Sequence, residues 1–315
     1  MRTPAMQPPF EPSFLRVNDG PLGQRFCIHH PPATQPALGL VLHVHPFAEE
    51  MNKSRRMAAL QARALAAAGY AVLQIDLLGC GDSAGDSGDA TWAAWVGDVV
   101  WAASHLRARH ADLSPGHLRP PLWLWGHRAG ALLAVQAAEQ LAAVDPPHLL
   151  LWQAASSGNS VLQQFLRLKM AAELAGGGGM GVTEGLKRQL AAGQAVEVAG
   201  YSISPALATG LEAARLRPPP GTGIVTGKAT TLIWIELSPA DTDALSPAAT
   251  QAQAAWQAAG WQVHTRRVQG PQFWQTTEIE DAPALIGATL QALQLASAEP
   301  HPLPGVGPDT QQQAA

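Results

Sequence analysis

Short, continuous apolar runs recur along the chain, separated by longer stretches whose apolar residues follow helical spacing. Runs of this kind are typical of strands buried on both faces of a parallel sheet. The intervening stretches are rich in alanine, leucine and glutamine, which favours helices. This alternation predicts right-handed βαβ crossovers and a doubly wound, mostly parallel sheet with helices on both faces. The predicted strands are 39–44, 70–75, 122–125, 148–152, 231–235 and 261–268, and the predicted helices are 52–68, 92–109, 129–142, 247–259 and 282–295.

The chain is expected to begin with an antiparallel hairpin. Residues 14–17 and 25–29 are short apolar runs, and Asn18-Asp19-Gly20 between them is a strong turn signal. These two runs precede the parallel strands, so they count as the first and second of eight. The sheet then continues with strands three to eight.

The alternation of strands and helices stops between residues 156 and 226. This segment contains a helical piece over 161–174, a glycine run over 176–179 and a proline break over 218–220. We predict that it is a lid inserted between the sixth and seventh strands. The predicted organisation is an N-terminal arm (1–13), one α/β domain that includes the lid (14–295) and a disordered tail (296–315).

Composition narrows the classes of function. Hydrophobic residues make up 47% of the chain and charged residues 14%, which suits a globular domain with a large core. The formal net charge of -4 gives no basic field, so we expect no nucleic-acid partner. No run approaches the ~20 apolar residues of a membrane span, and the N-terminus lacks a signal-peptide core. Cys27 and Cys80 form no metal pair or disulfide framework. We therefore expect a cytoplasmic protein without metal or cofactor.

The sequence Gly126-His127-Arg128-Ala129-Gly130 follows an apolar strand and opens an alanine-rich helix. This strand–turn–helix context is that of the G-x-S-x-G nucleophile elbow, and it predicts an α/β-hydrolase fold. Arg128 stands where the nucleophile belongs. A guanidinium has five donors and no acceptor, so it cannot attack a carbonyl. Beside a helix N-terminus it fits an anion-binding site, with His127 and Ala129 as neighbours. The alternative is an ordinary tight turn with a surface arginine.

The other members of a hydrolase triad are expected further along the chain, the acid first and the histidine last. After the strand at 231–235, the acid position falls on Glu236, Asp241 or Asp243, and the sequence does not choose among them. After the last strand, Gln272 occupies the expected histidine position, and glutamine cannot shuttle a proton. His264 lies on the last strand itself, where packing is the better explanation.

Loops after the third and fourth strands supply further candidates. His45-Pro46-Phe47 stands where an oxyanion-hole loop is expected, with the Phe47 amide as the donor. His43 and His45 also suit a core pair. Asp76 follows the fourth strand and is expected to border the pocket.

Other residues are candidates for a replacement nucleophile or for additional cations. Cys80, Ser83, Ser156 and Ser157 have no evident base, so structural roles are favoured. Lys53 and Arg55 lie in a mixed-charge run that suits either a solvated helix start or a share in the Arg128 anion site. The tryptophans at strand ends, Trp125, Trp152, Trp234 and Trp274, suit core packing better than the lining of a sugar or acyl pocket.

Four segments of the chain resemble the exosortase A system-associated hydrolases of the second type. They are HPFAEEMNKSRRMAALQARALAAAGYAVLQIDLLGCGDSAGD, LWLWGHRAG, LLLWQAASSG and GPQFWQTTEIEDAPALI, and the resemblance spans about residues 14 to 295. It implies a bacterial protein that accompanies an exosortase, PEP-CTERM sorting and exopolysaccharide production. It also implies that arginine at the elbow is a family trait.

Three hypotheses follow. The first is a catalytically altered hydrolase that binds an anionic, acyl or saccharide ligand through Arg128, the helix terminus and the Phe47 amide. The second is an active ester or acyl hydrolase that uses another nucleophile or an activated water, with Arg128 stabilising the oxyanion. The third is an interaction factor that binds polysaccharide-synthesis proteins through its lid and aromatic surface.

Overall fold

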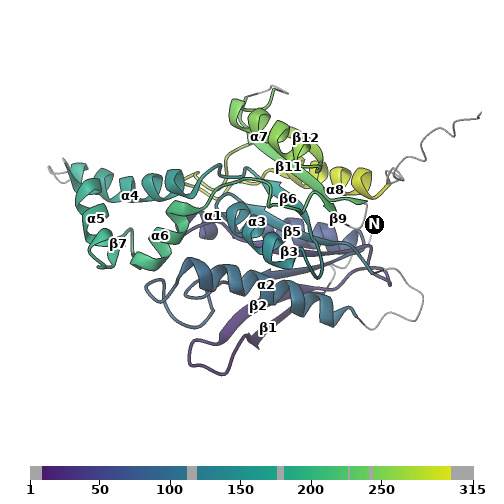
Figure 1. Ribbon diagram of the computed structural model, residues 1–315, viewed down its shortest axis with the longest axis horizontal. Coiled ribbons are helices and arrows are strands. Elements are labelled where there is room, and N and C mark those ends of the chain that lie inside the picture. Colours follow the sequence, from purple (N-terminus) through teal and green to yellow (C-terminus); the bar gives the residue numbers. More distant parts are fainter. Residues whose placement is uncertain (1–8, 112–118, 176–180, 226–227, 241–243, 299–315) are drawn as a thin grey trace, which may run out of the picture.

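Eight strands form one sheet in the computed structural model, which describes residues 9–111, 119–175, 181–225, 228–240 and 244–298 (Figure 1). The strand order is β1-β2-β4-β3-β5-β6-β11-β12. β1 and β2 pair antiparallel, β2 is antiparallel to β4, and the remaining neighbours are parallel. The predicted hairpin and parallel sheet are confirmed. The strands are β1 (Glu11–Arg16), β2 (Gln24–His30), β3 (Gly39–Val44), β4 (Tyr70–Ile75), β5 (Leu122–His127), β6 (His148–Trp152), β11 (Thr231–Ser238) and β12 (Gln262–Gln269).

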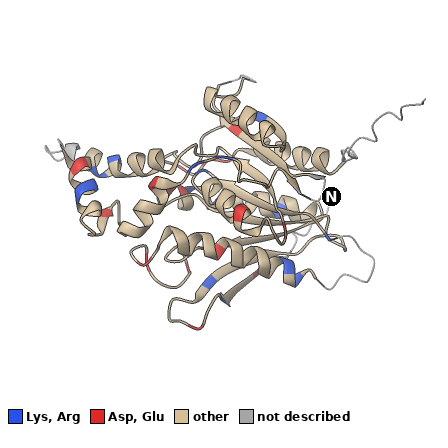
Figure 2. Ribbon diagram, in the orientation of Figure 1, with Lys and Arg blue, Asp and Glu red and all other residues tan. Residues whose placement is uncertain are grey.

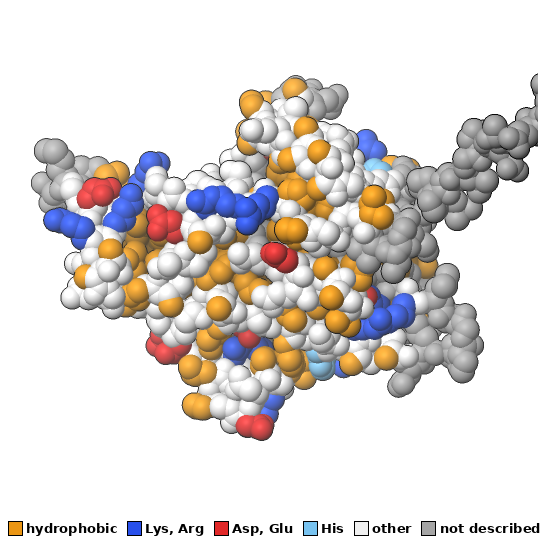
Figure 3. All heavy atoms as spheres, viewed as in Figure 1, with side chains coloured by type: hydrophobic (Ala, Val, Ile, Leu, Met, Phe, Trp, Pro, Cys, Tyr) orange, Lys and Arg blue, Asp and Glu red, His pale blue; other side chains and the backbone are white. Residues whose placement is uncertain are grey.

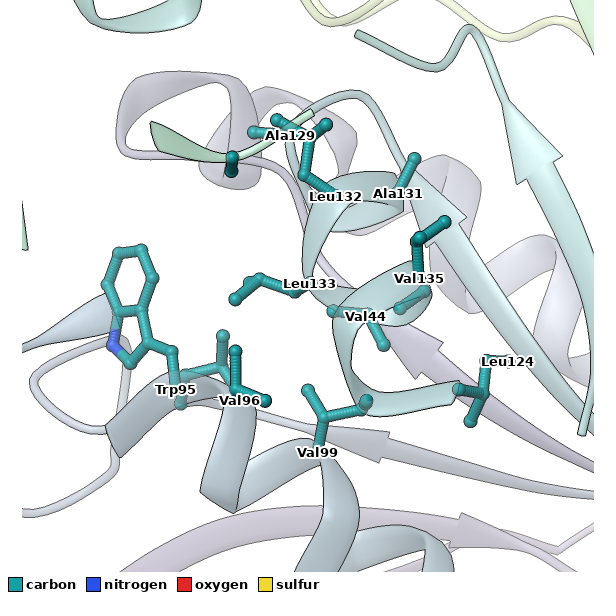
Figure 4. Packing of buried hydrophobic residues seen from close by; sticks show 14 of the residues in the cluster. Val44, Trp95, Val96, Val99, Leu124, Ala129, Ala131, Leu132, Leu133 and Val135 are labelled. Atoms are coloured by element: carbon teal, nitrogen blue, oxygen red, sulfur yellow. The ribbon is translucent and has the colours of Figure 1, made fainter. Parts of the chain in front are cut away.

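Helices cover both faces of the sheet because the central strands are apolar on both sides. Leu40 and Leu42 of β3 belong to one hydrophobic cluster, whereas Val41 between them belongs to the other. The first cluster is covered by α2 (Trp92–Arg109), α3 (Gly130–Leu141) and α7 (Pro247–Ala258). The second is covered by α1 (Glu49–Ala67) and α8 (Pro283–Ala298). Figure 4 shows Trp95, Val96 and Val99 of α2 facing Leu133 of α3, beside Val44 and Leu124 of the sheet.

An insertion joins β6 to β11 and extends to the left in Figure 1. Its helix α4 contains the predicted helix, but the structure also has two helices and two small hairpins that we did not predict. The glycine run at 176–179 lies outside the described residues. The elements are α4 (Gly158–Ala175), α5 (Val182–Ala191), β7 (Val196–Val198), β8 (Tyr201–Ile203), α6 (Pro205–Ala213), β9 (Ile224–Val225) and β10 (Lys228–Ala229).

Hydrogen bonds attach the insertion to the start of α1 and to a loop at the carboxyl end of the sheet. The Tyr201 hydroxyl accepts from Asn52 Nδ2 at 2.9 Å and donates to Glu49 at 3.2 Å. The Ser204 side chain caps α6 and donates to the Ala90 carbonyl at 2.6 Å. The insertion therefore lies against the start of α1 and the loop before α2, which is the side of the sheet that carries the elbow.

Both predicted ends of the domain need correction. β1 begins at Glu11, inside the predicted arm, because residues 11–16 pair with β2 along their full length. At the other end, α8 continues to Ala298, three residues into the predicted tail. Residues 1–8 and 299–315 lie outside the described part of the chain.

Charged side chains are sparse on the ribbon (Figure 2), and two ion pairs link elements beneath the surface. Arg25 of β2 and Asp98 of α2 pair at 2.8 Å with both side chains almost fully buried. Arg107 of α2 pairs with Asp145 at 2.6 Å. On the face in Figure 3, hydrophobic side chains are mixed with polar ones, and several basic groups lie over the insertion. Within the described residues, no helix is both long and apolar enough to cross a membrane.

Candidate functional site

The turn between β5 and α3 has the tight geometry of an elbow. Arg128 has φ 54°, a left-handed conformation that is strained for a residue with a side chain. A Cβ on Gly126 would lie 2.5 Å from the Ala131 Cα, and one on Gly130 would lie 2.2 Å from the Val44 carbonyl oxygen. Both flanking positions therefore require glycine. The elbow predicted from the motif is present, and the ordinary-turn alternative is wrong.

The Arg128 side chain is held inside the protein. Its Nε and Nη2 donate to the Glu50 carboxylate at 3.0–3.3 Å, and Nη2 also lies 3.4 Å from Gln164 Oε1 of α4. The guanidinium carbon lies 5.7 Å from the centre of a Trp274 ring. The Arg128 side chain is only 15% exposed and that of Glu50 20%. The elbow cation therefore has a carboxylate partner and is linked to both α1 and the insertion.

A pocket of about 270 Å³ lies next to this ion pair, and we call it the elbow pocket. Glu50, Gln164 and Trp274, all three partners of Arg128, line it. The remaining lining combines apolar side chains with hydrogen-bonding ones: Phe47, Val161, Phe165 and Leu168, and Glu49, Lys53 and Gln275. An apolar pocket with a few polar groups is typical of small-molecule sites.

The loop after β12 approaches the elbow through a different residue from the one that we predicted. Trp274, and not Gln272, lies against Arg128 and lines the elbow pocket. Trp274 and Phe273 are buried and also pack on His127. A turn in which Gln275 N–H donates to the Gln272 carbonyl accounts for this two-residue offset.

Of the three acid candidates, Glu236 lies within the described residues, and its carboxylate is bonded to the start of α7. Both Glu236 carboxylate oxygens accept hydrogen bonds from Ser246, one from the backbone N–H at 2.8 Å and one from the hydroxyl at 2.6 Å. Glu236 therefore fixes the start of α7, where Ser246 is the N-cap. Asp241 and Asp243 lie outside the described residues.

The loop between β3 and α1 also carries a residue in a strained backbone conformation. Ala48 has φ 49° immediately after Phe47, the predicted amide donor. The Phe47 ring packs edge-on against Phe165 of the insertion at 5.1 Å and against Trp95. Phe47 therefore lies at the elbow pocket as expected. The role of its amide stays a prediction.

Three buried histidines surround the elbow, and burial lowers the pKa of each. The pKa of His43 falls to about 3, and that of His127 lies well below its ordinary value. His45 donates from Nδ1 to the Pro46 carbonyl at 2.7 Å and accepts the Leu77 N–H at Nε2, which fixes a neutral tautomer. His127 packs within an aromatic group that includes Trp152 and Trp274. These side chains are neutral packing groups near pH 7.

The two additional cation candidates, Arg55 and Lys53, lie at different cavities. Arg55 donates to Asp76 at 3.2 Å, and both line a different cavity on the other side of α1. The Asp76 carboxylate also accepts the Asp82 N–H. Arg55 therefore does not join Arg128, and Asp76 does not border the elbow pocket. Lys53 does line that pocket, one helical turn after Glu50.

The candidate replacement nucleophiles that follow are either protonated or hydrogen-bonded within the fold. Burial and the nearby Asp76 carboxylate raise the pKa of Cys80 to about 12, so the thiol is protonated. The Ser83 hydroxyl accepts the Phe26 N–H and donates to the Asp76 carbonyl. Ser157 bonds to Ser160 in the first turn of α4. Within the described residues, no group of three or more potential metal ligands lies together.

Comparisons with known proteins agree with this architecture. A family described as serine aminopeptidase, S33, matches residues 35–176, which run from before β3 to the end of α4. Alpha/beta hydrolase domain-containing protein 10 from mouse is similar in structure, with a TM-score of 0.52, 14% identity, and coverage of 91% of this chain and 98% of that one. This chain has the α/β-hydrolase fold.

Two esterase-named structures show the same fold at similarly low sequence identity. Est1E from Butyrivibrio proteoclasticus with bound ferulic acid has a TM-score of 0.58 and 15% identity, covering 88% of this chain and 96% of that one. A thermostable carboxyl esterase from Bacillus coagulans in complex with glycerol has a TM-score of 0.58 and 14% identity, with coverages of 92% and 99%. No curated protein matches the sequence.

Proposed function

We propose that this α/β-hydrolase-fold chain binds an acyl or saccharide ligand in the elbow pocket without forming an acyl-enzyme. The observation that carries the proposal is the state of Arg128. It occupies the nucleophile position with strained elbow geometry, and its guanidinium is bonded to Glu50 and stacked near Trp274. A guanidinium supplies no electron pair for attack on a carbonyl carbon.

The lining of the elbow pocket supports this ligand class. Phe47, Phe165 and Leu168 provide apolar surface for an acyl chain or the face of a sugar. Gln164 and Lys53 provide hydrogen bonds for hydroxyl or carbonyl oxygens. An anionic ligand has to displace Glu50 from Arg128. The positive charge of Arg128 therefore favours an anionic ligand less strongly than we predicted from the sequence.

The biological setting rests on the resemblance to the exosortase-associated hydrolases. We propose a cytoplasmic role beside exosortase-linked exopolysaccharide production, with an acylated or saccharide intermediate as the ligand. Polysaccharide-synthesis proteins are the proposed macromolecular partners. The esterase names of two structural neighbours agree with an acyl-containing ligand.

The test is a panel of ester, thioester and acetylated-sugar substrates, assayed for both turnover and binding. Binding is followed by tryptophan fluorescence, because Trp274 lines the pocket. The proposal predicts saturable binding that Leu168→Ala weakens, with no turnover by the wild type or by Arg128→Ala. Robust wild-type turnover would overturn it.

A second candidate function is hydrolysis by an activated water. The observation that favours it is Glu50, whose carboxylate lines the elbow pocket beside the guanidinium. In this scheme Glu50 removes a proton from water, the resulting hydroxide attacks the ester carbonyl, and Arg128 stabilises the oxyanion. The tetrahedral intermediate then collapses, the bond to the alkoxy oxygen breaks, and the departing alcohol takes the proton from Glu50. Turnover that Glu50→Gln abolishes and Glu49→Gln retains would support this candidate.

A further inference from the structure

A second cavity, of about 220 Å³, lies between α1 and strands β2, β3 and β4, and we call it the α1 cavity. It shares no lining residue with the elbow pocket. Its volume is more than ten times the ~15 Å³ that a cavity needs to hold one water. It therefore has room for a small molecule, and the proposed function does not use it.

Two buried polar atoms belonging to residues of this cavity have no hydrogen-bond partner among the described residues. They are Nε2 of His43 and the hydroxyl oxygen of Ser54, and both residues are at least nine-tenths buried. A serine inside a helix commonly donates to the carbonyl four residues earlier, but Ser54 does not. A buried polar group without a hydrogen-bond partner carries a free-energy cost. A ligand that pairs with both atoms would remove that cost.

The charges around the cavity favour an uncharged ligand. Burial, together with the nearby His45 and Arg55, lowers the pKa of His43 to about 3, so the ring is neutral near pH 7. Both nitrogens of His45 already have partners. Arg55 and Asp76, two charged residues of the lining, form an ion pair with each other. Nothing here compensates a buried ion, and burying an unpaired ion is costly.

We propose that the α1 cavity is a second binding site, for a small polyol. One ligand hydroxyl pairs with His43 Nε2 and another with the Ser54 hydroxyl. The carbon skeleton lies against the apolar lining, which includes Ile28, Met51 and Ile75. A neutral imidazole and a hydroxyl can each donate or accept, so both suit hydroxyl groups.

The probe for the test is erythritol, and the signal is the indole N–H of Trp125 in a ¹H–¹⁵N spectrum. The Trp125 ring centre lies 4.3 Å from that of His43. The peak is assigned with Trp125→Phe. Sucrose at equal concentration reports the general co-solvent effect, because a disaccharide is too large for this cavity. The proposal predicts a saturable shift with erythritol and none with sucrose.

Variants separate the site from the elbow pocket. Ser54→Ala should weaken erythritol binding about 3- to 10-fold, the effect of one lost hydrogen bond. Ser54→Leu fills the cavity and should abolish the shift, and Gln164→Ala in the elbow pocket should leave it unchanged. Thermal unfolding checks that each variant is folded. A shift that stays linear in erythritol, equals that with sucrose or survives in folded Ser54→Leu would overturn the proposal.

Discussion

Replacing Glu50 with glutamine isolates the charge that faces the elbow cation. Glutamine keeps the size and one acceptor oxygen but removes the negative charge, so Arg128 keeps a hydrogen bond and loses its counter-ion. The Arg128–Glu50 pair is mostly but not fully buried. Exposed ion pairs contribute about 0–1 kcal/mol to stability, and breaking a fully buried pair costs about 3–5 kcal/mol, so this pair should fall between the two. We expect Glu50→Gln to lower the free energy of unfolding by about 1–2 kcal/mol.

The same substitution should create an anion site. The uncompensated guanidinium lies beside the N-terminus of α3, and both attract anions. An anion present at ten times its dissociation constant stabilises the folded state by about 1.4 kcal/mol. Urea unfolding with and without millimolar inorganic phosphate, at constant ionic strength, measures this gain. We expect phosphate to restore most of the stability lost in Glu50→Gln and to have little effect on the wild type.

The matched control is Glu49→Gln, the preceding residue of α1. Glu49 lines the same pocket but accepts a hydrogen bond from Tyr201 and has no recorded contact with Arg128 within the described chain. It should not gain phosphate sensitivity. Equal phosphate effects in the wild type, Glu49→Gln and Glu50→Gln would refute the reasoning that Glu50 neutralises the elbow cation.

Three further predictions concern the elbow turn, the buried histidines and the buried thiol. Gly130→Ala should destabilise the fold by more than about 3 kcal/mol in a urea titration, because the new Cβ meets the Val44 carbonyl oxygen. The control is Gly97→Ala on α2. Its new Cβ meets nothing within 4 Å, so this variant should be neutral or stabilising in the same titration. The folded pKa of His43 is about 3 and the ordinary value is 6.5, so the unfolded state binds more protons between these values. Stability should fall by up to about 1.4 kcal/mol per pH unit for this group as the pH drops below 6.5, and His43→Phe should flatten that slope. Cys80 should resist iodoacetamide at pH 7.5 in the folded protein and react in urea, as mass spectrometry of tryptic peptides can show; rapid labelling of the folded chain would contradict the raised pKa.

Features carried by local sequence were predictable. The parallel strands were found because each is a continuous apolar run between turn signals, and the elbow was found because its glycines follow one of these strands. The start of α6 carries a comparable local signal, since Ser204 caps the helix and Pro205 occupies its first turn. The two hairpins of the insertion are only two or three residues per strand, too short for a periodic pattern.

Partners distant in the sequence were not predictable. Glu50 is 78 residues from Arg128. An arginine at the elbow indicates an anion site, for which the sequence offers the further cations Lys53 and Arg55. The structure instead pairs Arg128 with an acid of the chain itself. Trp274 was read as core packing, and it does pack in the core, but the same ring also lies against the elbow. Side-chain direction within a turn decided between Gln272 and Trp274.

We propose that the cation at the elbow forms no covalent intermediate with an acyl group. The most direct measurement is the intact mass of the wild-type protein after incubation with a fluorophosphonate, a reagent that modifies activated serine nucleophiles. We expect an unmodified mass for the wild type and for Arg128→Ala under conditions that fully label an active serine esterase. A stoichiometric adduct on a serine of the folded wild-type chain would contradict it.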